Sequence, residues 1–161
     1  MNRAVFLDRD GVVNMELGDY VWKPENFILC PRILENLQEL RDRGYLLAVI
    51  TNQGGIAKGI YTHEDVNSTL NHMVSLCREA GIEFVEVMYS PHHDTVGESI
   101  SRKPDSLMFE RILYKHNIDP QKSFMIGDKE RDIIPAEKLG MTGFLIEKNV
   151  DIEYLLAKIP A

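Results

Sequence analysis

Five short apolar segments alternate with amphipathic helical patterns along this chain, and the alternation constrains its fold more than any other feature. The segments with the length and apolar content of buried strands are residues 5–7, 45–50, 82–89, 123–126 and 142–146. Repeated strand–helix units form a parallel sheet with helices on both faces. The sequence therefore predicts a doubly wound, Rossmann-like α/β fold of about five strands, built as a single domain over residues 1–161.

The predicted helices carry recognisable start and stop residues. Pro31 stands where the first turn of a helix would begin, and Gly44 would end that helix. Thr62 opens a capping box at the start of the next helix, and Pro135 is expected to shift or kink a later one. The helical patterns cover residues 31–43, 62–81, 105–116, 130–139 and 151–159.

Composition places the chain among globular proteins and argues against several classes of partner. Of its 161 residues, 44% are hydrophobic and 27% are charged, and the formal net charge is −7. The acidic balance argues against a broad nucleic-acid surface, and no apolar run approaches the length of a membrane span. Cys30 and Cys77 match no metal or redox spacing, so we expect buried thiols in a reducing compartment. No signal peptide is recognised, and the expected location is the cytoplasm.

Polar side chains with catalytic potential follow the predicted strands. In a parallel α/β sheet, ligands bind beyond the carboxyl ends of the strands, so these residues are expected to meet at one edge of the sheet. The candidates are Asp8, Asp10, Thr51, Asn52, Gln53, Arg102, Lys103, Asp128, Lys129 and Asp132. Each of them alone has an ordinary explanation as a helix cap, a turn residue or a solvated charge. Their recurrence at successive strand ends is what indicates a functional site.

The acidic members of this set predict a metal site. Several carboxylates around one point repel one another unless a cation lies among them, and hard oxygen ligands favour Mg²⁺. A divalent cation together with Lys and Arg side chains supplies the charge stabilisation that a transferring phosphoryl group requires. A carboxylate can also be the nucleophile, as in enzymes that form an aspartyl-phosphate. The pattern therefore predicts phosphoryl transfer with Mg²⁺ as cofactor.

Taken together, these motifs resemble those of the haloacid dehalogenase superfamily of phosphotransferases. The segment Asp8-Arg-Asp-Gly is similar to the first motif of the superfamily, Thr51 to the second, Lys103 to the third, and residues 127–132 to the fourth. Within the superfamily, the segments FLDRDGVVN, TNQGGIAKG, PHH, RKP and GDKERD resemble the D-glycero-D-manno-heptose 1,7-bisphosphate phosphatases. The histidinol-phosphate phosphatases share most of these motifs, and Val13-Asn14 favours the heptose enzymes over them.

The resemblance implies a separate catalytic role for each motif residue. Asp8 would attack phosphorus and form the aspartyl-phosphate. Asp10 would protonate the leaving oxygen and then take a proton from the water that hydrolyses the intermediate. Thr51 and Lys103 would hold the phosphoryl oxygens, and Lys103 would also screen the charge of Asp8.

The resemblance also implies the metal and substrate contacts. Mg²⁺ would be bound by Asp8, by the backbone carbonyl of Asp10 and by Asp128, while Asp132 would orient these ligands without binding the ion. The implied substrate contacts are Asn52, Gln53, Arg102 and Lys129. The planar fork of Arg102 suits a second phosphate or a pair of sugar hydroxyls.

One departure from the family pattern concerns a structural zinc. The family commonly binds zinc through a Cys-x-His pair and a later Cys-x-Cys pair directly before Arg-Lys-Pro. Here the matching positions read Ser90-Pro-His92 and Ser99-Ile-Ser101. A serine hydroxyl is a poor zinc ligand compared with a thiolate, so we expect no structural zinc. His92 or His93 would then be a hydrogen-bonded loop residue near the site, and residues 90–101 are candidates for mobility.

The chain offers no insertion long enough for a large cap domain. Residues 15–29 lack periodicity and form either a flap over the site or an ordered loop with a small hairpin. A site closed only by short loops could admit either a small phosphorylated metabolite, which we expect, or the end of a larger molecule. The resemblance to single-domain enzymes predicts a monomer. Histidinol phosphate and other sugar phosphates are alternative substrates, and a nucleic-acid 3′-phosphate is disfavoured by the charge balance. A non-catalytic binding module is disfavoured because every catalytic motif residue is present.

Overall fold

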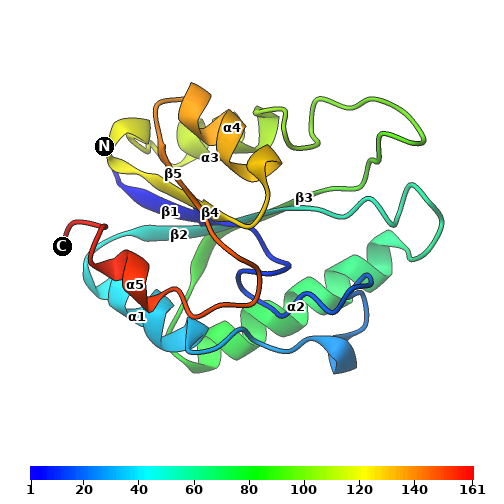
Figure 1. Ribbon diagram of the computed structural model, residues 1–161, viewed down its shortest axis with the longest axis horizontal. Coiled ribbons are helices and arrows are strands. Elements are labelled where there is room, and N and C mark those ends of the chain that lie inside the picture. The colour runs from blue at the N-terminus through cyan, green and yellow to red at the C-terminus, as the bar shows by residue number, and fades with distance from the viewer.

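The computed structural model describes residues 1–161 and is built around one parallel sheet (Figure 1). Its strands are β1 (Ala4–Leu7), β2 (Leu46–Asn52), β3 (Phe84–Ser90), β4 (Phe124–Gly127) and β5 (Thr142–Leu145). They lie in the order β3-β2-β1-β4-β5, and every neighbouring pair is parallel. The chain winds outward from β1 to β3 and then returns to the other side of β1, so the topological switch point lies between β1 and β4. This confirms the predicted doubly wound α/β fold.

Helices cover both faces of the sheet. Figure 1 shows α1, α2 and α5 on one face and α3 and α4 on the other. The helices are α1 (Ile33–Asp42), α2 (His63–Glu79), α3 (Leu107–Lys115), α4 (Glu130–Lys138) and α5 (Glu153–Leu156). Two short 3₁₀ turns, Pro24–Asn26 and Pro120–Lys122, were not predicted. None of the helices combines the length and the apolar content that crossing a membrane requires.

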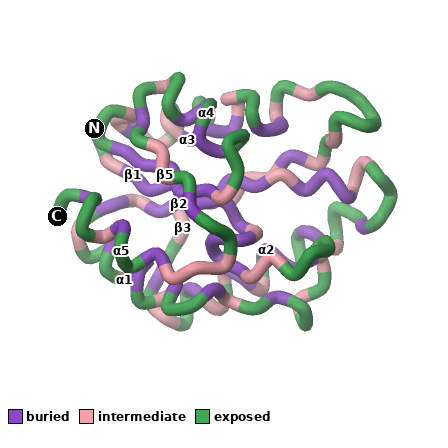
Figure 2. Tube along the Cα trace, in the orientation of Figure 1, coloured by how far each residue is buried: buried purple, intermediate pink, exposed green.

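The core has two layers because both faces of the parallel sheet are covered. Along β1, Val5 and Leu7 belong to a cluster of 25 buried residues shared with α1, α2 and α5, whereas Ala4 and Phe6 belong to a cluster of 12 shared with α3 and α4. A strand that is buried on both faces is apolar at every position, as β1 is. The central strands β1, β2 and β4 are buried along most of their length, whereas the edge strands β3 and β5 are mostly half-buried or exposed (Figure 2).

The two cysteines are buried free thiols, as predicted. Burial raises the pKa of Cys30 to about 12 and that of Cys77 to about 11, so both remain protonated and unreactive at neutral pH.

Several predicted element boundaries were wrong. The helix predicted from Pro31 begins at Ile33, because Arg32 adopts a left-handed conformation with φ 52° and interrupts it. The last helix is much shorter than residues 151–159. Strand β2 extends through Asn52, so two of the candidate site residues are its last residues. Helix α4 contains Pro135 and still runs unbroken to Lys138.

Candidate active site

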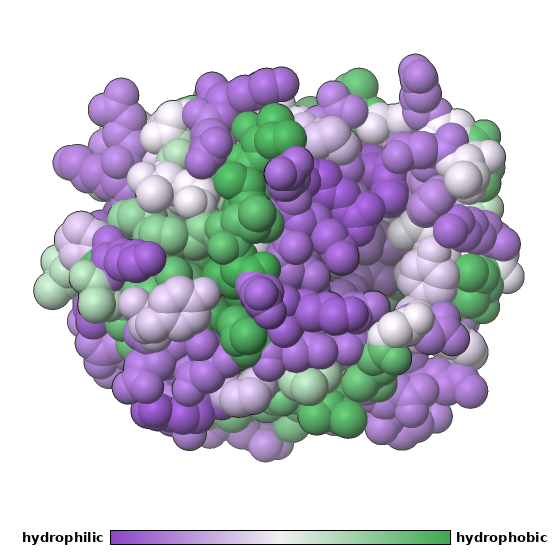
Figure 3. Space-filling view, viewed as in Figure 1, coloured by the Kyte–Doolittle hydropathy of each residue, from purple (hydrophilic) through white to green (hydrophobic).

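A pocket of ≈ 280 Å³ lies beyond the carboxyl ends of β1, β2 and β4. Figure 3 shows a hydrophilic hollow on this face of the molecule. Eight of the ten predicted site residues line the pocket: Asp8, Asp10, Thr51, Asn52, Gln53, Lys103, Asp128 and Lys129. The other six lining residues are Glu16, Gly18, Asp19, Tyr20, Val21 and Arg131. The structure therefore brings together side chains from four separate segments, while Arg102 and Asp132 lie outside the pocket lining.

Lys103 is a buried cation held between two carboxylates. Its Nζ lies 3.0 Å from Oδ1 of Asp8 and 2.5 Å from Oδ1 of Asp132, and it donates to the carbonyl of Ile50 at 2.9 Å. The side chain is only 1% exposed, and burial by itself would favour the neutral amine. The two carboxylates outweigh burial and raise the pKa of Lys103, so the ammonium is fully charged at neutral pH.

Asp8 carries an unfavourable negative charge in this position. Burial and the neighbouring carboxylates of Asp132, Asp10 and Asp128 raise its pKa to about 8, although Lys103 opposes them. Burial, followed by the charge of Asp132, also raises the pKa of Asp128. The raised pKa values of these two carboxyl groups mean that the site has too little positive charge to balance its carboxylates.

The donor set in this pocket fits a divalent cation. Carboxylate oxygens of Asp8, Asp128 and Asp132 lie within 4.8 Å of one another. Oδ1 of Asp128 is buried and has no hydrogen-bond partner, which is costly unless it binds something. Asp132 is already engaged by Lys103 and by the backbone N–H of Lys129 at 3.2 Å. The geometry therefore favours Asp8 and Asp128 as ligands, and the orienting role that the resemblance implies for Asp132 stays a prediction.

A glycine makes the close approach of Asp128 possible. Gly11 has φ +85°, and a Cβ at this position would lie 2.7 Å from Oδ2 of Asp128. A glycine is therefore required directly after the Asp-Arg-Asp segment, both for the turn and for the space.

Asp10 is held by three side chains. Its Oδ1 accepts hydrogen bonds from Nη2 of Arg9 at 2.7 Å and from Nδ2 of Asn14 at 3.1 Å, and its Oδ2 accepts one from Nε2 of Gln53 at 3.2 Å. Arg9 is 1% exposed and also donates to the carbonyl of Val21 at 2.5 Å. Sequence reasoning missed Arg9 because an arginine between two aspartates reads as a solvated turn residue.

Asn52 is engaged by the protein backbone. Its Oδ1 accepts from the N–H of Lys103 and its Nδ2 donates to the carbonyl of the same residue, both at 3.0 Å. The side-chain amide thereby ties the end of β2 to the loop that carries Lys103. Asn52 lines the pocket, and its predicted contact with substrate stays a prediction.

Glu16 and residues 18–21 form one wall of the pocket, within the segment 15–29 where a flap or an ordered loop was expected. The wall is tied down by the ion pair between Glu16 and Lys148 at 2.5 Å and by the hydrogen bond from the Thr69 hydroxyl to the carbonyl of Trp22 at 2.8 Å. An isolated antiparallel bridge between Asn14 and Leu29 closes its base. These contacts correspond to the ordered-loop alternative.

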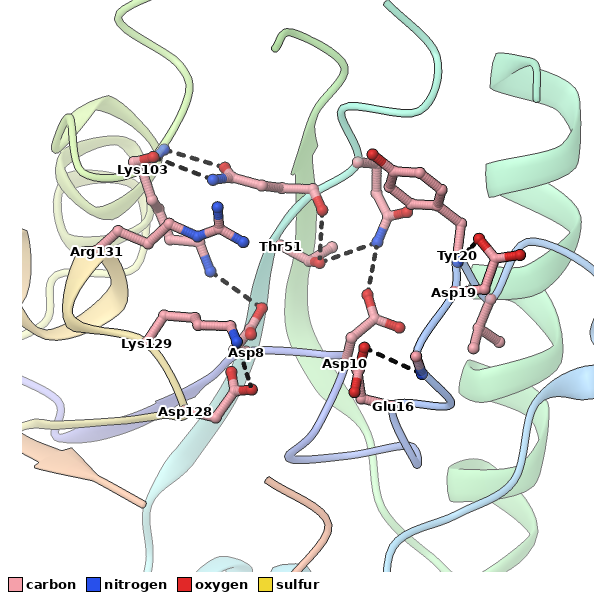
Figure 4. A pocket seen from close by; sticks show the side chains of 14 residues that line it. Asp8, Asp10, Glu16, Asp19, Tyr20, Thr51, Lys103, Asp128, Lys129 and Arg131 are labelled. Carbon is pink, nitrogen blue, oxygen red and sulfur yellow. Dashed lines mark hydrogen bonds and ion pairs between the residues drawn. The ribbon is translucent and has the colours of Figure 1, made fainter. Parts of the chain in front are cut away.

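The cations of the pocket lie together on one side, next to Asp8 and Asp128, and the other carboxylates lie across from them (Figure 4). Figure 4 shows Lys103, Lys129 and Arg131 on one side and Asp10, Glu16 and Asp19 on the other. Arg131 is exposed, forms no ion pair and was missed by sequence reasoning. The available signal was its place in the first turn of the helix that follows Asp128, since that turn faces the carboxyl end of the sheet.

Arg102 faces the loop of residues 90–101. Its Nη1 donates to the carbonyl of His92 at 3.0 Å, and its Nε lies 3.3 Å from Oδ1 of Asp94. Arg102 does not line the pocket, and its predicted contact with substrate stays a prediction. His93 is hydrogen-bonded to the Thr95 hydroxyl at 2.9 Å.

The three serines that stand at the cysteine positions of the family's zinc pattern are close together. The hydroxyl of Ser101 lies 2.8 Å from that of Ser90 and 2.9 Å from that of Ser99. Neutral hydroxyls thus hydrogen-bond one another where thiolates would need a metal. These contacts order the base of the loop, and the predictions on zinc and on mobility remain to be tested.

Comparison with known proteins identifies relatives of this chain. Residues 100–160 match the family model described as HAD-hydrolase-like. The D-glycero-beta-D-manno-heptose-1,7-bisphosphate 7-phosphatase of Haemophilus ducreyi is 37% identical over 145 residues, which is 86% of this chain and 79% of that protein. The enzyme of the same name from Vibrio cholerae is 39% identical over 144 residues, covering 86% and 77%. A relative from Photorhabdus laumondii, 34% identical over 86% and 79%, is named for the alpha anomer.

A solved structure is similar over nearly the whole chain. The D,D-heptose 1,7-bisphosphate phosphatase from B. bronchiseptica, complexed with magnesium and phosphate, superposes with a TM-score of 0.84 at 26% identity. The alignment covers 98% of this chain and 88% of that one.

Proposed function

This chain belongs to the haloacid dehalogenase-like hydrolases, in the family of the D-glycero-D-manno-heptose-1,7-bisphosphate 7-phosphatases, and from that premise we propose that it removes the 7-phosphate from this sugar bisphosphate. One observation carries the proposal: Asp8 and Asp128 lie with the buried cation Lys103 in one pocket at the switch point of the sheet. A nucleophile, metal ligands and a fixed positive charge are the parts that phosphoryl transfer requires.

In this mechanism, Oδ of Asp8 attacks phosphorus and the bond to the sugar oxygen breaks. Asp10 gives its proton to that leaving oxygen, so the sugar departs as an alcohol. Asp10 then takes a proton from a water molecule, which attacks the aspartyl-phosphate and releases inorganic phosphate and free Asp8. Lys103 and the hydroxyl of Thr51 stabilise the phosphoryl oxygens, and the position of both in the pocket lining supports this role.

Asp8, Asp128 and the backbone carbonyl of Asp10 would hold Mg²⁺. When bound, the ion supplies positive charge that favours the anionic form of Asp8 and stabilises the phosphoryl group. The unpartnered Oδ1 of Asp128 and the raised pKa of Asp8 support this assignment.

The second phosphate of the substrate needs its own cations. Lys129 and Arg131 line the pocket on the side of Lys103; Nζ of Lys129 lies 3.9 Å from Oδ2 of Asp128, whereas Arg131 forms no ion pair. A guanidinium binds phosphate through two parallel hydrogen bonds. We therefore assign the non-reacting phosphate to Lys129 and Arg131.

Phosphate release from a substrate panel tests the proposal. The panel contains both anomers of D-glycero-D-manno-heptose 1,7-bisphosphate, histidinol phosphate and p-nitrophenyl phosphate, each assayed with MgCl₂ and with EDTA. The expected result is the highest kcat/KM for a heptose bisphosphate and loss of activity in EDTA. Histidinol phosphate as the best substrate would overturn the substrate assignment, and activity undiminished in EDTA would overturn the metal assignment.

A further inference from the structure

Tyr61 lies behind the pocket lining and is connected to Asp10 through one side chain. The Tyr61 hydroxyl donates to Oε1 of Gln53 at 2.8 Å. Nε2 of Gln53 in turn donates to Oδ2 of Asp10 at 3.2 Å and to Oγ1 of Thr51 at 3.0 Å. Tyr61 is 4% exposed and Gln53 is 3% exposed, so both groups depend on protein partners. Both N–H groups and the carbonyl oxygen of the Gln53 amide are therefore engaged.

We propose that Tyr61 is a positioning residue for the phosphatase reaction, because its hydroxyl fixes the amide of Gln53 with its N–H groups toward Asp10 and Thr51. The reversed amide would place Oε1 against the Asp10 carboxylate, where two acceptors repel each other. The inference rests on the proposed function, in which Asp10 transfers protons and Thr51 holds a phosphoryl oxygen. Gln53 thus aligns two groups that act on the same phosphate ester.

The position of Tyr61 is fixed by its neighbours. Its ring is stacked on Trp22, with centroids 6.1 Å apart and planes at 20°, and it meets the ring of Tyr20 edge-on at 5.6 Å. Both partners belong to the segment of residues 15–29 that carries the pocket wall, and the chain enters the capping box of α2 directly after Tyr61. Burial raises the pKa of Tyr61 to about 12, so the hydroxyl retains the proton that it donates.

A mutant cycle with Tyr61→Phe and Gln53→Met tests the proposal. If Tyr61 acts through Gln53, Tyr61→Phe lowers kcat about tenfold and leaves KM within about twofold. Gln53→Met lowers kcat further, and the double variant is no slower than Gln53→Met alone, since the second change removes a contact that no longer exists. Each assay is run below the thermal unfolding midpoint of the variant.

Tyr45→Phe is the matched control. Tyr45 is also 4% exposed, and its hydroxyl donates to the carbonyl of Pro160 at 3.0 Å, at the opposite end of β2 from the pocket. This substitution removes a partly buried hydrogen bond of a buried tyrosine, so it is expected to lower the unfolding midpoint while kcat stays within about twofold of wild type.

Two results overturn the inference while leaving the proposed function intact. One is a Tyr61→Phe enzyme whose kcat matches that of Tyr45→Phe. The other is a double variant whose loss of kcat equals the product of the two single losses, which would mean that Tyr61 and Gln53 act independently. A wild-type chain without phosphatase activity overturns both the inference and the proposed function.

Discussion

At the residue scale, the chemistry depends on how the protein divides charge among neighbouring side chains. Lys103 is shared between Asp8 and Asp132, and this single buried ammonium compensates only part of the surrounding negative charge. Asp8 consequently has a raised pKa, and Asp128 keeps an oxygen atom without a partner. Both features are unfavourable in the metal-free protein, and both become favourable when a cation binds.

Asp8→Asn is expected to abolish turnover without loss of the fold. An amide cannot form the aspartyl-phosphate, so kcat should fall by at least about 1,000-fold. Because the charge of Asp8 is disfavoured by burial, the unfolding midpoint in EDTA should be unchanged or higher than that of wild type. Phosphate release and thermal unfolding measure the two effects. Retained turnover would exclude Asp8 as the nucleophile.

Arg131→Gln is expected to weaken recognition of the second phosphate. The ratio of kcat/KM for the heptose bisphosphate to that for p-nitrophenyl phosphate should fall by about 10- to 100-fold, as for the loss of one charge-assisted bidentate contact. Arg111→Gln is the matched control, because Arg111 is also exposed, lies on α3 and has no acidic partner. An equal ratio in both variants would contradict the assignment.

At the element scale, hydrogen bonds between serine hydroxyls hold together the base of the loop between β3 and α3. Ser90 is fully buried at the end of β3, and its hydrogen bond to Ser101 joins the two ends of the loop. Next to these serines, Arg102 donates a hydrogen bond to the backbone carbonyl of His92 in the same loop. The base of the loop is thus held by neutral hydrogen bonds, and such bonds impose weaker constraints than a bound metal ion.

Replacing all three serines by cysteine is expected to create a zinc site. The Ser90→Cys, Ser99→Cys, Ser101→Cys variant should bind about one equivalent of Zn²⁺ with His92 as the fourth ligand, because the three side chains already converge. Metal analysis after dialysis provides the measurement. The wild-type protein should retain no zinc, and adding His92→Ala to the triple variant should weaken binding. Zinc retained by the wild type would contradict the prediction.

At the scale of the whole molecule, the order of the strands creates the site. Strand β1 lies at the centre of the sheet, and β2 and β4 flank it, so their carboxyl ends carry Asp8, Thr51 and Asp128 to one place. Helices on both faces exclude water from the sheet, which strengthens the interactions between these charges. The site is therefore a property of the topology, and its charge balance affects the stability of the entire fold.

Magnesium is expected to stabilise the protein more at high pH than at low pH. In the metal-free protein the pKa of Asp8 is raised from its ordinary value of 3.8 to about 8. Between these two pH values the folded state therefore binds more protons than the unfolded state does. Stability without metal should therefore fall as pH rises through this range. Mg²⁺ competes with the proton, so the increase in unfolding midpoint on adding MgCl₂ should be larger at about pH 8.5 than at about pH 6.

Thermal unfolding in EDTA and in MgCl₂ at the two pH values checks this expectation. The Asp8→Asn variant is the control, because it lacks the titrating group and should lose most of the pH dependence. An increase in midpoint that is equal or smaller at the higher pH would contradict it.

Local pattern was sufficient to predict the sheet and most of the site. The apolar segments and helical periodicity predicted the doubly wound fold, and eight of the ten predicted site residues line one pocket. These predictions succeeded because strand ends in a parallel sheet meet at one edge, whatever the details of packing. Element ends were less predictable: Arg32 interrupts a helix pattern and α5 stops early. Tertiary contacts engage both places, since Arg32 bonds to Glu153 and Arg43 donates to the carbonyls of Leu156 and Ile159.

What the sequence determined by itself is therefore the order of the elements and the identity of the charged groups. Only the tertiary structure decided which partner each group has. Arg9 donates a hydrogen bond to Asp10 directly, and Tyr61 is connected to Asp10 through Gln53. Arg131 lines the pocket, and Arg102 donates to the carbonyl of His92 in the loop of residues 90–101. The physical reason is that periodicity records which residues are buried, whereas hydrogen bonds between distant segments depend on side-chain directions that exist only after the chain has packed.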